Sequence, residues 1–285
     1  MPWFLLSLLV FQSSSSPELS ARIRQLIESS GAEVAVAIRS VDGRVNLSID
    51  PDKSFHAAST MKVPIMIELF RQAEAGRVKL DDQLAVRNEF HSIVDGSVYQ
   101  MDVNEDSDGE VYKAVGKTMS LRLLCEAMIT VSSNFAANLL IEKLGPANVQ
   151  ATVDRLGGTG VKVLRGVEDQ KAFDKGLNNT TTAAGLAGLF AKLAAGEAVS
   201  AKADAEMIAI LKRQKFTDAI PAGVPPGTPV AHKTGTITRI HHDAGIVFGP
   251  KPYVIVVLVR GIQDQKVSGP LMASISRVAW TALSK

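Results

Sequence analysis

Cysteine is nearly absent from this chain, and neither sign of charge is in excess. The single cysteine, Cys125, excludes an intramolecular disulfide and any metal site built from several cysteines. The 31 lysines and arginines almost balance the 29 aspartates and glutamates, which leaves a formal net charge of +2. A chain with so little net charge has no broad field to attract nucleic acid or an anionic membrane. We therefore expect no nucleic-acid partner.

The chain also lacks a hydrophobic run long enough to span a bilayer. Its first apolar segment, Trp3 to Phe11, is too short for a transmembrane helix and resembles the apolar part of an export signal. No lysine or arginine precedes it, so a disordered cytoplasmic leader is the alternative. We interpret residues 1–16 as a signal segment. The mature protein is then exported, to the periplasm or outside the cell, and has no membrane span.

What the sequence does contain is ordinary globular material with strands at both ends. Hydrophobic residues make up 46% and charged residues 21% of the 285 residues, enough for one large domain or two interleaved ones. Apolar periodicity predicts strands over 33–39, 45–49, 230–236, 243–248 and 253–260. Helix signals cover 17–30, 59–76, 121–131, 135–144, 149–156, 182–195, 200–212 and 270–283. The polar stretch 81–117 is expected to form loops, and its acidic patch over 102–110 could rim a cleft or be a solvated surface without a role.

This order of elements predicts an α/β fold with an inserted all-α domain. The strands near the two chain ends are expected to form one antiparallel sheet flanked by the terminal helices, in a domain made of residues 17–58 and 215–285. The all-α domain covers residues 59–214. An active site is expected at the seam between the two domains, where the helix that begins near residue 59 would lie.

Ser59-Thr60-Met61-Lys62 is the first candidate catalytic motif. In one helical turn, the hydroxyl of residue i and the amine of residue i+3 lie on the same face, within hydrogen-bond reach. A desolvated lysine can lose its proton and serve as the base for a serine nucleophile. The start of the helix also presents unpaired N–H groups to an oxyanion. A helix cap followed by a surface lysine would have the same sequence pattern. The tetrapeptide alone is therefore weak evidence for a nucleophile.

Ser132-Ser133-Asn134 is the second motif, and it lies between two helical runs. The hydroxyl of Ser132 could relay a proton to a leaving nitrogen, and the carboxamide of Asn134 could hold a substrate amide. Serine and asparagine between helices are more often plain turn residues. This motif therefore gains meaning only from its place after the first.

Lys233-Thr234-Gly235-Thr236 is the third motif, on the strand that begins at Val230. Lys233 and Thr234 suit a substrate carboxylate, and Gly235 lets a substrate lie close to the strand edge. The N–H of Thr236 could join that of Ser59 in an oxyanion hole. The alternative is an exposed edge strand with a protective lysine.

In order and separation, the three motifs resemble those of the penicillin-recognising serine hydrolases, and most closely the class A β-lactamases with S-x-x-K, S-D-N and K-T-G. The resemblance covers roughly residues 17–285 and implies a β-lactamase/transpeptidase-like fold. It also implies acyl transfer through a serine ester, without a metal or organic cofactor. The ligand would be a small β-lactam or a peptide like D-Ala-D-Ala. We expect the protein to be a monomer.

The resemblance assigns a role to each matched residue. Ser59 would be the nucleophile, Lys62 its proton partner and Ser132 the proton relay to the leaving nitrogen. Asn134 would position the substrate amide. The strand motif would bind the substrate carboxylate through Lys233 and Thr234, beside Gly235 and Thr236.

Two departures from the family pattern set the main question. Ser133 stands where the family has aspartate, so that loop must be supported differently. Class A β-lactamases carry on an omega loop the glutamate that activates the deacylating water. The matching loop here is 165–182, and counting back from its threonines without gaps puts Gly166 at the glutamate position. Glu168 and Asp169 are the nearest carboxylates, and Glu168 is the candidate deacylation base.

The base of the same loop has changed as well. Asn179 replaces the aspartate that pairs in the family with an arginine like Arg165, so the usual ion pair across the loop is lost. If Glu168 still reaches the site, the sequence predicts a β-lactamase. If it does not, acylation proceeds and deacylation stalls, as in a DD-peptidase, a slow β-lactamase or a β-lactam sensor. The serine glutaminases share S-x-x-K but lack the K-T-G strand, which argues against that family.

A metal site is the remaining alternative, because His232, His241, His242 and Asp243 are close in sequence. Neighbouring residues of a strand point to opposite faces, so His241 and His242 cannot jointly chelate one ion from that strand. We therefore predict no metal and expect these histidines to line or support the strand edge. Arg239 could add a second positive charge toward a substrate carboxylate, or it could lie exposed without a role in the site.

Overall fold

The computed structural model describes residues 16–284 and contains a five-stranded antiparallel sheet with the strand order β2-β1-β11-β10-β9. The predicted signal segment, 1–16, lies outside the described residues apart from its last one. The strands are β1 (Glu33–Ser40), β2 (Asn46–Ile49), β9 (Val230–Ile237), β10 (Ile240–Val247) and β11 (Tyr253–Arg260). The expected antiparallel sheet built from both ends of the chain is thus confirmed.

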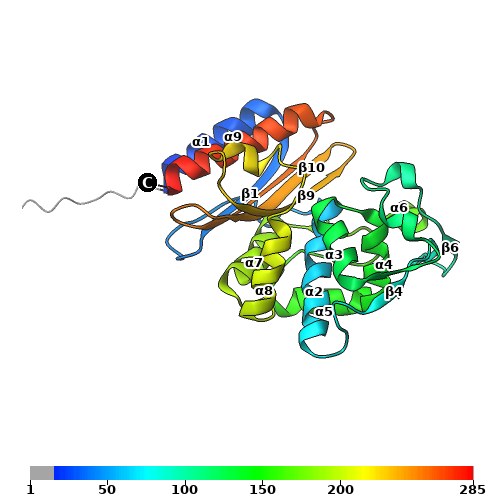
Figure 1. Ribbon diagram of the computed structural model, residues 1–285. Helices are drawn as coiled ribbons and strands as arrows, with labels where there is room; N and C mark the ends of the chain where they lie inside the picture. The colour runs from blue at the N-terminus through cyan, green and yellow to red at the C-terminus, as the bar shows by residue number, and fades with distance from the viewer. Residues whose placement is uncertain (1–15, 285) are drawn as a thin grey trace, which may run out of the picture.

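Helices cover both faces of this sheet. Helices α1 (Ser16–Ser30) and α9 (Gln265–Leu283) lie side by side on one face, and α7 (Ala183–Ala195) packs on the other (Figure 1). The central strands are therefore buried on both sides. In β1, Ala35 and Ala37 join the core shared with the helical part, whereas Val34 and Val36 join the core under α1 and α9. Burial on both faces explains why these strands are almost continuously apolar.

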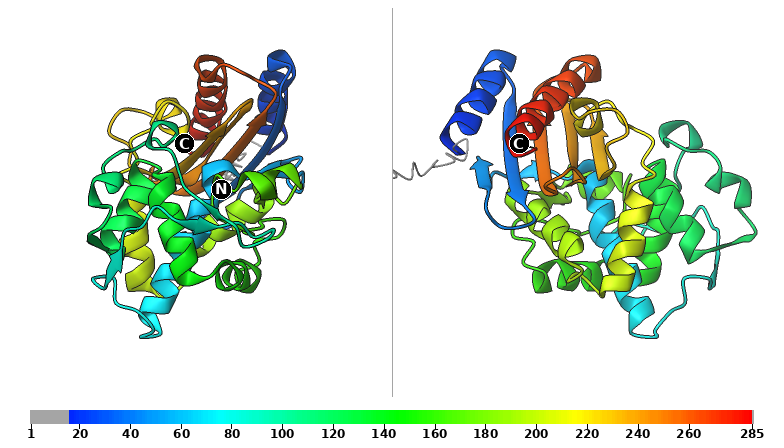
Figure 2. Two further views of the ribbon diagram at one scale, coloured as in Figure 1. Left: turned by 90° about the vertical axis from the view of Figure 1, so that its right-hand side faces the viewer. Right: turned by 60° about the vertical axis from the view of Figure 1, so that its left-hand side comes forward.

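The helical part of the chain lies between β2 and β9 in sequence, on the side of the sheet away from α1 and α9 (Figure 2). Its elements are the 3-10 turn η1 (Ala58–Met61), α2 (Lys62–Glu74), α3 (Leu121–Thr130), α4 (Asn134–Leu144), α5 (Pro146–Arg155), α6 (Gln170–Asp174) and α8 (Ala201–Leu211). Helix α2 runs through the middle and packs against α3, α4, α5 and α8. Ten of its thirteen residues are buried, so it forms a rigid base for η1.

Short elements lie in and around the 81–117 segment, which the sequence predicts as loops, and at other connections of the chain. They are the pairs β3 (Phe55–His56) with β8 (Thr180–Thr181), β4 (Gln83–Ala85) with β7 (Thr118–Ser120), and β5 (Phe90–His91) with β6 (Val98–Tyr99), and the 3-10 turns η2 (Val103–Glu105), η3 (Val111–Ala114) and η4 (Ile220–Gly223). Strands of two or three residues are too short to show a hydrophobic period, so the sequence pattern does not predict them.

Among the predicted boundaries that differ from the structure, three have a clear physical reason. Helix α9 begins at Gln265, five residues before Pro270, because Asp264 caps it and accepts a hydrogen bond from the N–H of Lys266 at 2.8 Å. Strand β10 begins at Ile240, because His241 and His242 are buried in it despite their polarity. Thr182 lies before α7 as its N-cap, with Oγ1 accepting from the N–H of Gly185 at 3.0 Å.

The overall architecture is that of an antiparallel sheet flanked by helices, with a helical part inserted between its strands. This is the predicted fold class. Among residues 16–284, no helix is both long and apolar enough to cross a membrane.

Candidate active site

The sequence predicts that Ser59 lies in the first turn of an α-helix. The structure places it in the 3-10 turn η1, directly before helix α2. In a 3-10 turn the side chains of residues i and i+3 stack over one another. The amine of Lys62, the first residue of α2, accordingly lies 3.0 Å from the Ser59 hydroxyl oxygen. The expected contact between nucleophile and amine is therefore present in a tighter turn.

Lys62 is completely buried, and its amine donates to neutral groups from the second motif. Nζ lies 2.6 Å from the carbonyl oxygen of Ser132 and 2.7 Å from Oδ1 of Asn134. Burial lowers the pKa of Lys62 to about 7, against the opposing effect of the Asp106 and Glu168 carboxylates. A substantial fraction of the amine is thus unprotonated near neutral pH, as a base for Ser59 requires.

This pKa predicts the pH dependence of acylation. Only the neutral amine can accept the Ser59 proton, so the acylation rate constant should rise about tenfold per pH unit below pH 7 and level off above it. Stopped-flow measurement of acylation by a chromogenic cephalosporin between pH 5 and 9 tests this. A rate that is flat through this range would show that the Lys62 amine is not the titrating base.

Lys233 on β9 reaches the hydroxyl of Ser132 from the other side. Its amine is fully buried and lies 2.9 Å from Oγ of Ser132 and 2.8 Å from the carbonyl oxygen of Thr234. Burial, with the nearby charge of Lys62 as the next cause, holds its pKa well below the ordinary lysine value. Oγ of Ser132 is also 3.3 Å from Nζ of Lys62. A hydroxyl placed between two amines is suited to pass a proton.

Strand β9 passes close to the nucleophile at Gly235. A Cβ on this residue would lie 3.1 Å from the backbone nitrogen of Ser59 and 3.1 Å from that of Thr60, so a side chain here would crowd the turn. Thr234 and Thr236 line the same cleft as Ser59. The structure thus brings the strand motif against η1, and the oxyanion role of the Thr236 N–H stays a prediction.

Asn134 connects the lysine to the loop carboxylate. Its Oδ1 accepts from Lys62, and its Nδ2 donates to Oε1 of Glu168 over 3.3 Å. Glu168 lies in the 165–182 loop and lines the cleft with Ser59. Burial raises the pKa of its carboxyl group above the usual value, with the charge of Lys62 acting against that shift. Glu168, which the sequence could not place, therefore reaches the site.

Asp169, the other loop carboxylate, does not reach the cleft. Its oxygens accept from the hydroxyl of Ser92 at 2.8 Å, the N–H of Ile93 at 2.9 Å and the N–H of Ala172 at 3.1 Å. It caps helix α6 and ties the loop to the 92–93 turn. Of the two loop carboxylates, Glu168 is therefore the one placed to contact the water that attacks the acyl-enzyme.

The base of the 165–182 loop is closed by an amide in place of an ion pair. Oδ1 of Asn179 accepts from the N–H of Leu164 at 2.8 Å, and its Nδ2 donates to the carbonyl of Arg165 at 2.9 Å. The Arg165 guanidinium donates to neutral oxygens, among them the carbonyl of Leu177 at 2.9 Å. The sequence predicts that the loop base has no ion pair, because residue 179 is asparagine. These contacts agree with that prediction.

Gly166, which gapless counting places at the glutamate position, has no room for a side chain. A Cβ there would collide with Oδ1 of Asn138. Asn138 is buried in α4, accepts from the N–H of Val167 at 2.7 Å and donates to its carbonyl at 2.9 Å. The sequence gives no signal for this residue, which holds the loop so that Glu168 lies two positions further on.

The cleft around these residues has a volume of about 500 Å³, which suits a small ligand. Its lining includes residues that the sequence did not single out as candidates, namely Ala58, Ser107, Val167, Phe216, Asp218, Ile237 and Gln265. It also includes Glu105 and Asp106, so part of the acidic patch rims the cleft. Ala58, Ser132 and Glu168 have φ of 44°, 61° and 63°. Positive φ is costly for residues with a side chain, and such strain gathers at functional sites.

The histidines of β9 and β10 make separate contacts, and His241 also lines the cleft of Ser59. Nδ1 of His232 lies 2.9 Å from Oδ1 of Asp243, and Nδ1 of His241 lies 2.8 Å from Oγ of Ser268. His242 points to the opposite face, with Nε2 3.0 Å from the carbonyl of His56, and burial lowers its pKa to about 4. Within residues 16–284, no group of three or more histidine, cysteine, aspartate or glutamate side chains is arranged to hold a metal.

Arg239 is not part of the cleft lining. It lies at the turn between β9 and β10 and donates to the carbonyl of Gly261 at 3.1 Å. Arg239 thus has the exposed position that the sequence left open, because its side chain is held at the end of the sheet.

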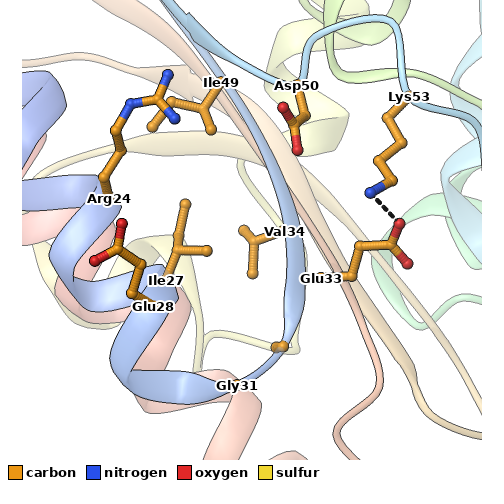
Figure 3. Close-up of a pocket in the computed structure, with 10 residues that line it drawn as sticks. Arg24, Ile27, Glu28, Gly31, Glu33, Val34, Ile49, Asp50 and Lys53 are labelled. Carbon is orange, nitrogen blue, oxygen red and sulfur yellow. Dashed lines mark ion pairs between the residues drawn. The ribbon is translucent and has the colours of Figure 1, made fainter.

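A second hollow, of about 400 Å³, lies between α1 and the β1–β2 edge (Figure 3). Lys53 lines this hollow, and its ammonium group forms an ion pair with Glu33. The hollow contains no serine or cysteine nucleophile among its lining residues. The cleft at Ser59 is thus the better candidate for catalysis.

Comparison with known proteins agrees with this arrangement. A sequence model described as Beta-lactamase enzyme family matches residues 18–283. A β-lactamase structure from Sphaerobacter thermophilus is 25% identical, with a TM-score of 0.81, and the match covers 94% of this chain and 98% of that one. PBP-A is 27% identical with a TM-score of 0.81, over 93% and 95% of the two chains. An ancestral class A β-lactamase is 26% identical with a TM-score of 0.80, over 93% and 99%.

Proposed function

This chain belongs to the β-lactamase enzyme family, and from that premise we propose that it is a serine β-lactamase that forms and then hydrolyses an acyl-enzyme. One observation carries the second half of this proposal. Asn134 contacts both Lys62 and Glu168, and Glu168 lines the same cleft as Ser59, so the groups suited to acylation and to deacylation lie at one site. A protein that only becomes acylated would not need the second group there.

Acylation uses the two lysines and two serines. Lys62 takes the proton of the Ser59 hydroxyl, and Oγ attacks the β-lactam carbonyl carbon, which becomes tetrahedral. The N–H groups of Ser59 and Thr236 are the proposed donors to the oxyanion. When the C–N bond breaks, Ser132 gives its proton to the leaving nitrogen and regains one from Lys62. Lys233 and Thr234 hold the substrate carboxylate during these steps.

Deacylation uses Glu168. Its carboxylate takes a proton from a water molecule, and the water oxygen attacks the ester carbonyl of acylated Ser59. Collapse of the second tetrahedral intermediate breaks the ester bond and returns the proton to Oγ of Ser59. The net reaction adds one water across the β-lactam amide, and the enzyme is restored.

A penicillin-binding DD-peptidase is the second candidate function. Two features of the 165–182 loop favour it. The residue at the family's glutamate position is Gly166, which has no carboxylate. Asn179 binds Arg165 through an amide hydrogen bond and not through an ion pair. PBP-A has a similar chain fold, and a structure of one of its point mutants is described as an acyl-enzyme complex with penicillin G. The two candidates differ in the lifetime of the acyl-enzyme.

Intact-mass measurement over time after mixing with benzylpenicillin separates them. For a β-lactamase, we expect an adduct of one penicillin on Ser59 that disappears while penicilloate accumulates beyond one equivalent. An adduct that persists, together with release of D-alanine from a D-Ala-D-Ala peptide, would support the peptidase. A persistent adduct without peptide cleavage would indicate a sensor.

A further inference from the structure

Asp106 contacts the N-terminus of helix α4 from a segment that is distant in sequence. Its Oδ1 accepts from the N–H of Asn134 at 2.8 Å, and its Oδ2 accepts from the N–H of Phe135 at 2.8 Å. The hydroxyl of Ser133 lies 3.3 Å from the same Oδ2. One carboxylate therefore binds three consecutive residues of the turn that carries the second motif.

These contacts are the strong kind that fix a helix start. The first N–H groups of a helix have no partner within it, and the positive end of the helix favours a negative charge. Hydrogen bonds from N–H groups to a carboxylate are roughly twice as strong as neutral ones. Ser133 itself caps the helix by accepting from the N–H of Ala136 at 3.2 Å, so its proton is available to Asp106.

The next residue of the segment extends the contact to Ser132. Oγ of Ser107 lies 2.9 Å from the carbonyl oxygen of Ser132 and 2.8 Å from that of Val131. Ser132 has a φ of 61°, which a residue with a side chain adopts only when its surroundings hold it there. Asp106 and Ser107 contact the turn on both sides of this strained residue.

We propose that Asp106 is the positioning residue for Ser132 and Asn134, supplying from the 102–110 segment the carboxylate that position 133 lacks. It acts through the turn and does not touch the reacting atoms. A shift of about 1 Å in either side chain would break its contact with Lys62, and misplacement of that size can cost about 100-fold in rate. This inference rests on the proposed acylation of Ser59.

The charge of Asp106 also acts on Lys62. Asp106 is the first of the two carboxylates that raise the lysine pKa against burial, and Glu168 of the 165–182 loop is the other. Lys233 of β9 is the third titratable group around this amine. Removal of the Asp106 charge should therefore lower the pH at which the Lys62 amine becomes neutral.

A double-mutant cycle tests the proposal, with Asp106→Ala, Ser133→Asp and the double variant. Asp106→Ala should lower the acylation rate constant about 100-fold and move the midpoint of its pH profile to lower pH. Ser133→Asp alone should also slow acylation, because two carboxylates would then face each other across about 3 Å. The double variant should recover to within about threefold of the wild type, since aspartate is a good N-cap and returns the charge to the turn.

Glu110→Ala is the matched control, because Glu110 lies in the same segment, is exposed and pairs with Lys113. Its acylation rate and pH midpoint should not change. A double variant no faster than Asp106→Ala, or an Asp106→Ala pH midpoint equal to the wild type, would overturn the proposal. If Asp106→Ala does not fold, Asp106→Asn keeps one acceptor without the charge and should still show the pH shift. If the wild type is never acylated, the proposed function is refuted. The melting temperatures of the four proteins in the cycle would then still measure the coupling between positions 106 and 133.

Discussion

Replacement of Glu168 by glutamine is expected to turn a cycling enzyme into one that stops after a single acylation. Glutamine keeps the size of the side chain and can still face Nδ2 of Asn134 through its oxygen, so acylation should change less than about threefold. It cannot take a proton from water. The contribution of a positioned general base is about 10²–10⁴-fold, so deacylation should slow by about 10³-fold.

The measurement is the time course of the Ser59 adduct by intact mass, with steady-state turnover of the same penicillin. The Glu168→Gln adduct should persist for at least hours where the wild-type adduct decays. Asp174→Asn is the control, because this exposed carboxylate lies on the same loop and accepts only from the side chain of Gln170 at 2.6 Å. Equal adduct lifetimes in Glu168→Gln and the wild type would remove Glu168 from the mechanism.

Glu168 also predicts how deacylation depends on pH. The base must be ionised, and burial holds its pKa above the ordinary glutamate value. Deacylation should therefore weaken as the pH falls through that raised pKa, and this acid limb should be absent from the residual rate of Glu168→Gln. The acid limb of acylation, which reports Lys62, should remain in the variant.

Ser59→Ala should abolish both adduct formation and turnover, with a loss of at least about 10⁴-fold, because it removes the oxygen on which the ester forms. The fold should survive. Lys62 keeps its contacts with Ser132 and Asn134 when the hydroxyl is removed, so no buried amine is left without a partner. We expect the melting temperature to change by only a few degrees.

Ser29→Ala, on the exposed end of α1, is the control for a serine without a role in the site. Intact mass and peptide mapping after treatment with benzylpenicillin show which serine carries the adduct. An adduct of unchanged yield in Ser59→Ala would mean that another residue is the nucleophile, and the assignment of all three motifs would then fail.

The local part of the site could be predicted from the sequence because it depends on helical spacing alone. Ser59 and Lys62 are three residues apart, so any helical turn brings them together. Ser132 and Lys233 are 70 and 101 residues from their partners in the site, and only the resemblance to a family with three ordered motifs brought them into one prediction.

The supporting residues could not be predicted in the same way. An acidic patch over 102–110 is visible in the sequence, but which of its carboxylates reaches the α4 turn depends on loop geometry that leaves no periodic pattern. The position of Glu168 depends on its positive φ and on the side chain of Asn138, which fills the space beside Gly166. Counting along the loop without gaps therefore gives the wrong residue at the family's glutamate position.

The pairing of β1 with β11 sets the order in which this protein can fold. Glu33 and Arg260, at one end of this ladder, form an ion pair although 227 residues separate them. Contacts so distant in sequence slow folding, since a long loop must close before they form. During synthesis, the β1–β2 hairpin is made early and its partner strand almost last. The helical part, with its more local contacts, is expected to collapse first, while β1 keeps an unpaired edge that can associate with other chains until residue 260 arrives.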